Sequence, residues 1–169
     1  MGHLEHRREA PLTVRIFVIT ASDSRGEAED AGGAFLREAT VRAGHLLAGY
    51  RLVKDDPVQI RSAIEEAARA SADVVIVNGG TGIAARDRTY EAVAALLEKR
   101  IDGFGELFRS LSYAEIGSAA MLSRAVGGVV KGRAVFSVPG SPAAVRLAWE
   151  KLLLPELGHM VGEIRKDER

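Results

Sequence analysis

The chain has 169 residues, of which 47% are hydrophobic, and its 23 basic residues equal its 23 acidic residues in number. This length and apolar content suit one compact domain with a sizeable core. The balanced charge argues against nucleic-acid binding, which needs a basic excess or a basic stripe. The absence of cysteine excludes disulfides, thiolate zinc sites and a thiol nucleophile. No apolar run approaches the roughly 18 residues of a membrane span.

The first residues differ in character from the rest. Residues 1–12 are charged and contain no apolar stretch, so they do not resemble a secretory signal. We predict a flexible lead-in over residues 1–12 and a single domain over residues 13–169. A cytoplasmic protein that binds neither membranes nor nucleic acid is expected.

Strands and helices are predicted to alternate along the chain. Apolar, β-branched runs indicate buried strands, and Asp56-Pro57 pairs a helix cap with proline at the first helical position. Thr89 and Ser141 provide similar caps, and Ser112-x-x-Glu115 resembles a capping box. The predicted elements are a strand over 14–20, a helix over 33–43, a strand over 46–53, a helix from 57, a strand over 73–77, a helix from 89, a helix from 112 toward 126, a strand over 134–138 and a helix from 142 to near 155.

Continuous apolar strands separated by helices are typical of a parallel sheet that is covered on both faces. The sequence therefore predicts an α/β protein with three layers, α/β/α, around a mostly parallel central sheet. Asn78-Gly79 resembles a hairpin turn, but a helix follows within about ten residues. We interpret it as a strand-to-helix loop.

Polar residues and glycines collect where the predicted strands end. In an open parallel sheet, ligands bind outside the carboxyl ends of the strands, so these residues should share one crevice. Asp56 there is mainly a helix cap, whereas the neighbouring Asp55 has no evident structural duty. The candidate site residues are Thr20, Ser22, Asp23, Asp30, Asp55, Gly79, Gly80, Thr81, Gly82, Asp87, Gly140 and Ser141.

Glycines at such a loop allow a ligand to approach bare backbone N–H groups, which suits phosphate. We expect Gly79 to Gly82 to be needed for this approach more than for folding. The motifs GxxxxGK[ST], HExxH and GxSxG are absent. Hydroxyls, amides and carboxylates suit a phosphorylated ligand with Mg²⁺. Structural roles remain open alternatives: a turn cap at Ser22-Asp23, a helix start at Ser141 and a helix cap at Asp87.

Seven stretches in order carry a family resemblance. They are Thr20-x-Ser22-Asp23, Asp30-x-x-Gly33, Val53-x-Asp55, Gly79-Gly80-Thr81-Gly82 through Arg86-Asp87-x-Thr89-x-Glu91, Gly103-Phe104-Gly105-Glu106-Leu107-Phe108-Arg109, Leu122-Ser123-Arg124 and Pro139-Gly140-Ser141-Pro142. With them the sequence, over about residues 13 to 160, resembles the MoaB/MogA family of molybdopterin-binding proteins. The segment from Gly103 and the following Ser112-Tyr113 look closer to the MoaB branch.

The resemblance implies a MogA-like molybdopterin-binding fold and a role in molybdenum or tungsten cofactor biosynthesis. Active members adenylylate the molybdopterin phosphate with ATP and Mg²⁺, releasing pyrophosphate. By position, Asp55 and Asp87 match the two important carboxylates, which are expected to be catalytic and to hold the metal. The remaining candidates match ligand-holding segments. A MoeA-type molybdate insertase is an implied partner. A homo-oligomer, trimer or hexamer, is expected through Gly103 to Arg109 with Leu111 and Tyr113.

Two positions depart from the family pattern. Gly32 stands where serine is common, which removes one hydroxyl, and Tyr90 stands where proline commonly opens the helix. A molybdopterin-binding protein without catalysis is the alternative function. A CinA-type nucleotide enzyme on the same fold is a further alternative, although its glycine loop differs.

Overall fold

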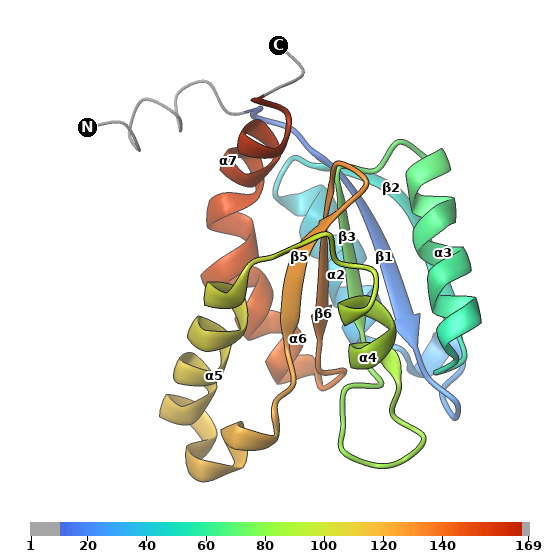
Figure 1. Ribbon diagram of the computed structural model, residues 1–169, viewed down its shortest axis with the longest axis vertical. Helices are drawn as coiled ribbons and strands as arrows, with labels where there is room; N and C mark the ends of the chain where they lie inside the picture. The colour runs from blue at the N-terminus through green and yellow to red at the C-terminus, as the bar shows by residue number, and fades with distance from the viewer. Residues whose placement is uncertain (1–10, 167–169) are drawn as a thin grey trace.

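The computed structural model describes residues 11–166, so residues 1–10 of the predicted lead-in lie outside the described part. Its centre is one sheet with the strand order β2-β1-β3-β6-β5-β4 (Figure 1). The first four strands of that order run parallel, whereas β5 is antiparallel to both β6 and β4. The strands are β1 (Arg15–Ala21), β2 (Leu46–Val53), β3 (Val74–Asn78), β4 (Lys99–Arg100), β5 (Val126–Val130) and β6 (Arg133–Val138).

Helices cover both faces of the sheet, which confirms the predicted three layers (Figure 1). Residues of α2, α5, α6 and α7 pack in one core cluster, and residues of α3 and α4 pack in the other. The helices are α2 (Ala31–Arg42), α3 (Pro57–Arg69), α4 (Thr89–Ala94), α5 (Asp102–Ile116), α6 (Pro142–Ala148) and α7 (Leu154–Ile164), with the short turns η1 (Glu27–Glu29), η2 (Gly117–Leu122) and η3 (Trp149–Leu153). No helix in the described range is long and apolar enough to cross a membrane.

The burial of β1 explains why its residues 16–19 are all apolar. Ile16 and Val18 belong to the core on one face, whereas Phe17 and Ile19 belong to the core on the other. Successive side chains of a strand point to opposite faces, so a strand covered twice must be apolar at every position.

The predicted helix from 112 toward 126 is wrong. The helix α5 begins ten residues earlier, at Asp102, and Ser112 is buried within it rather than capping it. The chain then forms η2 and the strand β5, which the sequence analysis missed together with β4. The reason is Gly127 and Gly128, which weaken any strand pattern. A Cβ at Gly127 would lie 2.3 Å from the Phe136 ring, so close packing requires glycine there.

The last helical region extends further than predicted. Instead of ending near Pro155, the chain passes from α6 through the π-helical turn η3 into α7, which ends at Ile164. Pro155 lies in the first turn of α7, where its missing N–H group is tolerated best. The cap at Asp56 is confirmed, because its carboxylate accepts hydrogen bonds from Val58 N (3.1 Å) and Gln59 N (2.9 Å).

Candidate functional site

A cleft of about 420 Å³ lies beyond the carboxyl ends of the parallel strands. Loops after β1, β2, β3 and β6 all contribute to it, as expected for an open parallel sheet. Ten of the twelve predicted site residues line it: Ser22, Asp23, Asp55, Gly79, Gly80, Thr81, Gly82, Asp87, Gly140 and Ser141.

The other two predicted site residues, Thr20 and Asp30, do not line the cleft. Both are buried, and the Asp30 carboxylate accepts hydrogen bonds from Thr20 Oγ1 (2.6 Å), Gly33 N (2.9 Å) and Tyr50 Oη (2.6 Å). Asp30 thereby caps α2. Burial, followed by the adjacent Asp30 carboxylate, raises the pKa of Tyr50 to about 12. These buried hydrogen bonds connect β1, β2 and the start of α2 next to the cleft.

Asp55 is the best-anchored carboxylate in the cleft. Its Oδ1 accepts hydrogen bonds from Thr89 Oγ1 (2.8 Å) and Arg88 N (3.1 Å), and its own N–H donates to Asp23 Oδ1 (3.0 Å). Burial raises the pKa of Asp55, and the negative charges of Asp23 and Asp87 add to this effect. The hydrogen bond from Thr89 opposes it. Asp55 therefore does have a structural role, joining the loops after β1, β2 and β3.

Asp87 does not cap the next helix. The N-cap position of α4 is Arg88, and Asp87 Oδ2 instead accepts a hydrogen bond from Ala84 N (3.1 Å). The carboxylate lies against the glycine loop, because a Cβ added to Gly82 would be 2.4 Å from Asp87 Oδ2. The structure thus places Asp87 as a loop-stabilising residue on the wall of the cleft.

The glycine loop is packed against the protein itself. Gly79 and Gly80 have φ values of +95° and +61°, which side chains rarely adopt. A Cβ at Gly79 would be 2.2 Å from Ala21 O, and one at Gly80 would be 2.3 Å from Asp55 Oδ2. The local fold therefore requires glycine at Gly79 and Gly80, and the role of these glycines in ligand approach stays a prediction.

Ser22 caps a turn and Ser141 caps α6, as the structural alternatives for these two residues predict. Ser22 Oγ accepts a hydrogen bond from Arg25 N (3.0 Å), which caps a turn. Ser141 Oγ accepts one from Ala144 N (3.3 Å), which caps α6. Both residues also line the cleft, so the structural and binding roles are compatible at these positions.

Three arginines near the cleft were not predicted as site residues. Arg25 and Arg86 line it, and Arg25 Nη1 donates to Gly140 O (3.3 Å). Arg124 donates from Nε to Thr81 O (2.9 Å) and from Nη2 to Gly82 O, and it forms an ion pair with Glu91. This side-chain hydrogen bond lowers the pKa of Glu91. Arg124 thus holds the glycine loop, and Arg25 and Arg86 add positive charge suited to phosphate.

The donor set can be tested against a metal ion. Among residues 11–166, no group of three or more His, Asp or Glu side chains is arranged to hold a metal. Mg²⁺ is commonly bound by one or two protein carboxylates together with substrate phosphates. Asp55 and Asp87 fit this partial role, because Asp87 contributes to the raised pKa of Asp55 and both face the same cleft.

Sequence comparisons identify the family of this chain. Residues 16–159 match a family described as "Probable molybdopterin binding domain". The chain belongs to the MoaB/MogA family. It is 52% identical to a molybdenum cofactor biosynthesis protein B of Bacillus anthracis, over 98% of this chain and 99% of the relative.

Solved structures show the same family. A crystal structure of a molybdenum cofactor biosynthesis protein B superimposes with a TM-score of 0.89 at 52% identity, covering 94% of this chain and 99% of that one. The tungsten cofactor synthesizing protein MoaB from Pyrococcus furiosus gives 0.86 at 39% identity, covering 92% and 99%. These matches support the MoaB branch over the CinA-type alternative.

Proposed function

We propose that this chain binds molybdopterin in the cleft and adenylylates its phosphate with Mg-ATP during molybdenum or tungsten cofactor biosynthesis. The observation that carries the proposal is the convergence of Asp55, Asp87, the glycine loop and two arginines on one cleft. Two carboxylates that line one cleft suit a divalent cation, and the arginines suit phosphate groups.

The reaction needs positioning and charge neutralisation more than covalent help from the protein. An oxygen of the molybdopterin phosphate would attack the α-phosphorus of ATP, and the bond to the departing pyrophosphate would break. Arg25 and Arg86 would neutralise phosphate oxygens, and the loop held by Arg124 would orient them. Mg²⁺, held by Asp55 and Asp87 with the triphosphate, would supply further stabilisation of the negative charge.

A function limited to binding molybdopterin is the alternative. It is favoured by the use of Asp55 Oδ1 as an acceptor for two protein donors. Incubation with Mg-ATP, with and without molybdopterin, separates the two functions. Pyrophosphate release that depends on molybdopterin supports the enzyme. Saturable molybdopterin binding without pyrophosphate supports the binding protein.

We also propose a homo-oligomer, although only part of the expected segment is exposed. Within Gly103 to Arg109, Phe104 and Phe108 are buried against the chain's own core, whereas Leu107 is 57% exposed. Further exposed apolar side chains continue this surface along α5 and η2: Tyr113, Ile116, Met121 and Leu122. Such a patch is typical of an interface between copies. Light scattering should give a multiple of 18.1 kDa, and a mass near 18.1 kDa at micromolar concentration contradicts the proposal.

The proposed product would be passed to a metal insertion step. A MoeA-type molybdate insertase is the proposed partner for that step, on the family resemblance alone. Co-purification of the two proteins, or faster consumption of the adenylylated product in the insertase's presence, would support it. Independent behaviour of both proteins at micromolar concentrations would contradict it.

A further inference from the structure

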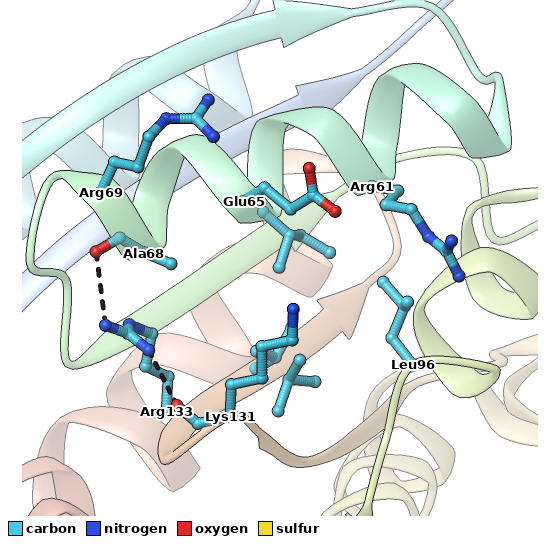
Figure 2. A pocket seen from close by; sticks show the side chains of 10 residues that line it. Arg61, Glu65, Ala68, Arg69, Leu96, Lys131 and Arg133 are labelled. Carbon is cyan, nitrogen blue, oxygen red and sulfur yellow. Dashed lines mark hydrogen bonds between the residues drawn. The ribbon is translucent and has the colours of Figure 1, made fainter.

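A second cavity, of about 310 Å³, lies between α3 and the hairpin that joins β5 to β6 (Figure 2). It lies beside the start of β6, whereas the cleft lies beyond the end of that strand. The floor is apolar and is made by Ile64, Ala68, Leu96, Val130 and Val135. All of these except Ala68 belong to, or pack against, the core on the α3 and α4 face.

The rim of this cavity is basic. Arg61, Arg69, Lys131 and Arg133 line it, with Glu65 as the acidic side chain among the lining residues. None of the four cations forms an ion pair with a carboxylate of residues 11–166. The formal net charge of the chain is zero, so this positive charge is a local concentration. A concave surface of one charge sign attracts ligands of the opposite sign.

Arg133 is held in place without being neutralised. Its Nη1 donates to Lys131 O (2.8 Å) and its Nη2 donates to Ala68 O (3.3 Å), which ties the hairpin to α3. Backbone carbonyls fix a guanidinium group but leave its full positive charge. Figure 2 shows this bridge on one side of the cavity, with Arg61 extending from α3 toward Leu96 on the other side.

Lys131 occupies a backbone position that a lysine rarely takes. It has a φ of +47° and is followed by Gly132 with a φ of +72°, between the paired residues Val130 and Arg133. Two-residue hairpin turns with two positive φ values favour Asn, Asp or Gly. The turn geometry therefore does not account for lysine. The side chain extends from the hairpin toward α3, over the cavity, which gives it a role there (Figure 2).

We propose that this cavity is a second binding site, for a small organic anion made of one flat apolar group and a phosphate or carboxylate. An apolar cavity of about 150 Å³ can hold benzene, so 310 Å³ suits a substituted single ring. The ring would lie on the apolar floor, and the anionic group would meet Arg61 and Lys131. This site is independent of the function proposed for the cleft.

The test is a titration of the methyl-labelled protein with phenyl phosphate, followed by NMR. Phenol and inorganic phosphate serve as comparison probes, since each carries half of the proposed chemistry. Saturable shifts of the Ile64, Leu96 and Val130 methyl signals are expected with phenyl phosphate, with at least tenfold weaker binding of both comparison probes. Shifts of Ala21 and Leu122 would report the cleft separately.

The matched variant is Arg61→Gln with Lys131→Asn. Asn tolerates positive φ better than lysine, so the fold should be retained while both charges are lost. Phenyl phosphate affinity should fall at least tenfold, and Lys151→Gln, an exposed position on the other face, should leave it unchanged. Three results would each overturn the proposal: no saturable shift at these methyls, equal binding of phenol or inorganic phosphate, or unchanged affinity in the folded double variant.

Discussion

The cleft and the basic cavity differ in how their charged side chains are held. In the cleft, each of the three aspartates accepts a hydrogen bond, Asp23 and Asp55 from a neighbouring loop and Asp87 from its own loop, so the three carboxylates are held in place. In the basic cavity, only Arg133 is fixed, and Arg61 and Lys131 extend over an apolar floor. A fixed polar arrangement suits chemistry that needs preorganised charge, whereas charges that extend over an apolar floor suit binding.

The largest effect is expected from removing charge in the cleft. Asp55→Asn and Asp87→Asn keep the side-chain shape but remove one negative charge each. Loss of a preorganised interaction of this kind typically costs on the order of 10²–10³ in rate. Pyrophosphate release should fall by this factor, with molybdopterin affinity changed far less. A folded variant that turns over within a few-fold of wild type would remove that aspartate from the proposed mechanism.

The glycine loop offers the next largest effect, with an internal control. Gly80→Ala places a methyl group at positive φ and against Asp55 Oδ2, whereas Gly44 has a φ of +81° with no atom within 4 Å of its Cβ position. Gly44→Ala therefore reports the backbone cost alone, about 1–2 kcal/mol. Gly80→Ala should cost more and should also reduce molybdopterin binding. Equal losses in denaturant unfolding would show that the contacts with Thr89 and Asp55 are unimportant.

A smaller effect concerns the stability of the cleft across pH. Because the pKa of Asp55 is raised, the folded state binds its proton more tightly than the unfolded state does. The stability from this proton is present at low pH and is lost as pH rises through the raised pKa. Asp55→Asn keeps an oxygen for Thr89 and Arg88, so it should be more stable than wild type at neutral pH.

That advantage should disappear in acid, where the wild-type carboxyl is itself neutral. Unfolding curves of both proteins at neutral pH and below the usual carboxyl pKa, near 4, measure the difference. Asp56→Asn is the matched control, because Asp56 caps α3 at an exposed helix start. A gap between Asp55→Asn and wild type that widens toward acid would contradict the assignment.

Much of the fold could be predicted because its signals are local. The strand β3 is a short run of β-branched residues, and Asp56-Pro57 marks the start of α3 within two residues. The position of the cleft followed from a rule about parallel strands, so ten of its residues could be named in advance.

What could not be predicted depends on contacts between distant segments. The strand β5 contains Gly127 because Phe136 of the neighbouring strand occupies that space, which no local pattern records. Arg124, which follows α5 and η2 in the chain, donates a hydrogen bond to Thr81 O of the glycine loop, 43 residues earlier. The basic cavity joins Arg61 of α3 to Lys131 of the hairpin. Conversely, Asp30 has the residue type of a ligand group but is buried as a helix cap.

The smallest effect concerns Gly32, beneath the cleft, where the family resemblance led us to expect serine. Gly32 is buried in the first turn of α2, and a Cβ there would be 3.0 Å from Asn78 Oδ1. That oxygen is buried and accepts no hydrogen bond from residues 11–166, whereas Asn78 Nδ2 donates to Ile19 O and to Thr20 Oγ1. A buried acceptor without a partner costs about 1–3 kcal/mol.

Gly32→Ser and Gly32→Ala add the same Cβ and so meet the same close contacts, which makes their difference informative. The serine hydroxyl can donate to Asn78 Oδ1, and the alanine methyl cannot. We therefore expect Gly32→Ser to be more stable than Gly32→Ala by about 1 kcal/mol in denaturant unfolding, the net worth of one hydrogen bond. Because Asn78 ends β3 directly before the glycine loop, the same variant should hold that loop more firmly. A serine variant no more stable than the alanine variant would mean that the missing hydrogen bond to Asn78 Oδ1 does not lower the stability of the protein.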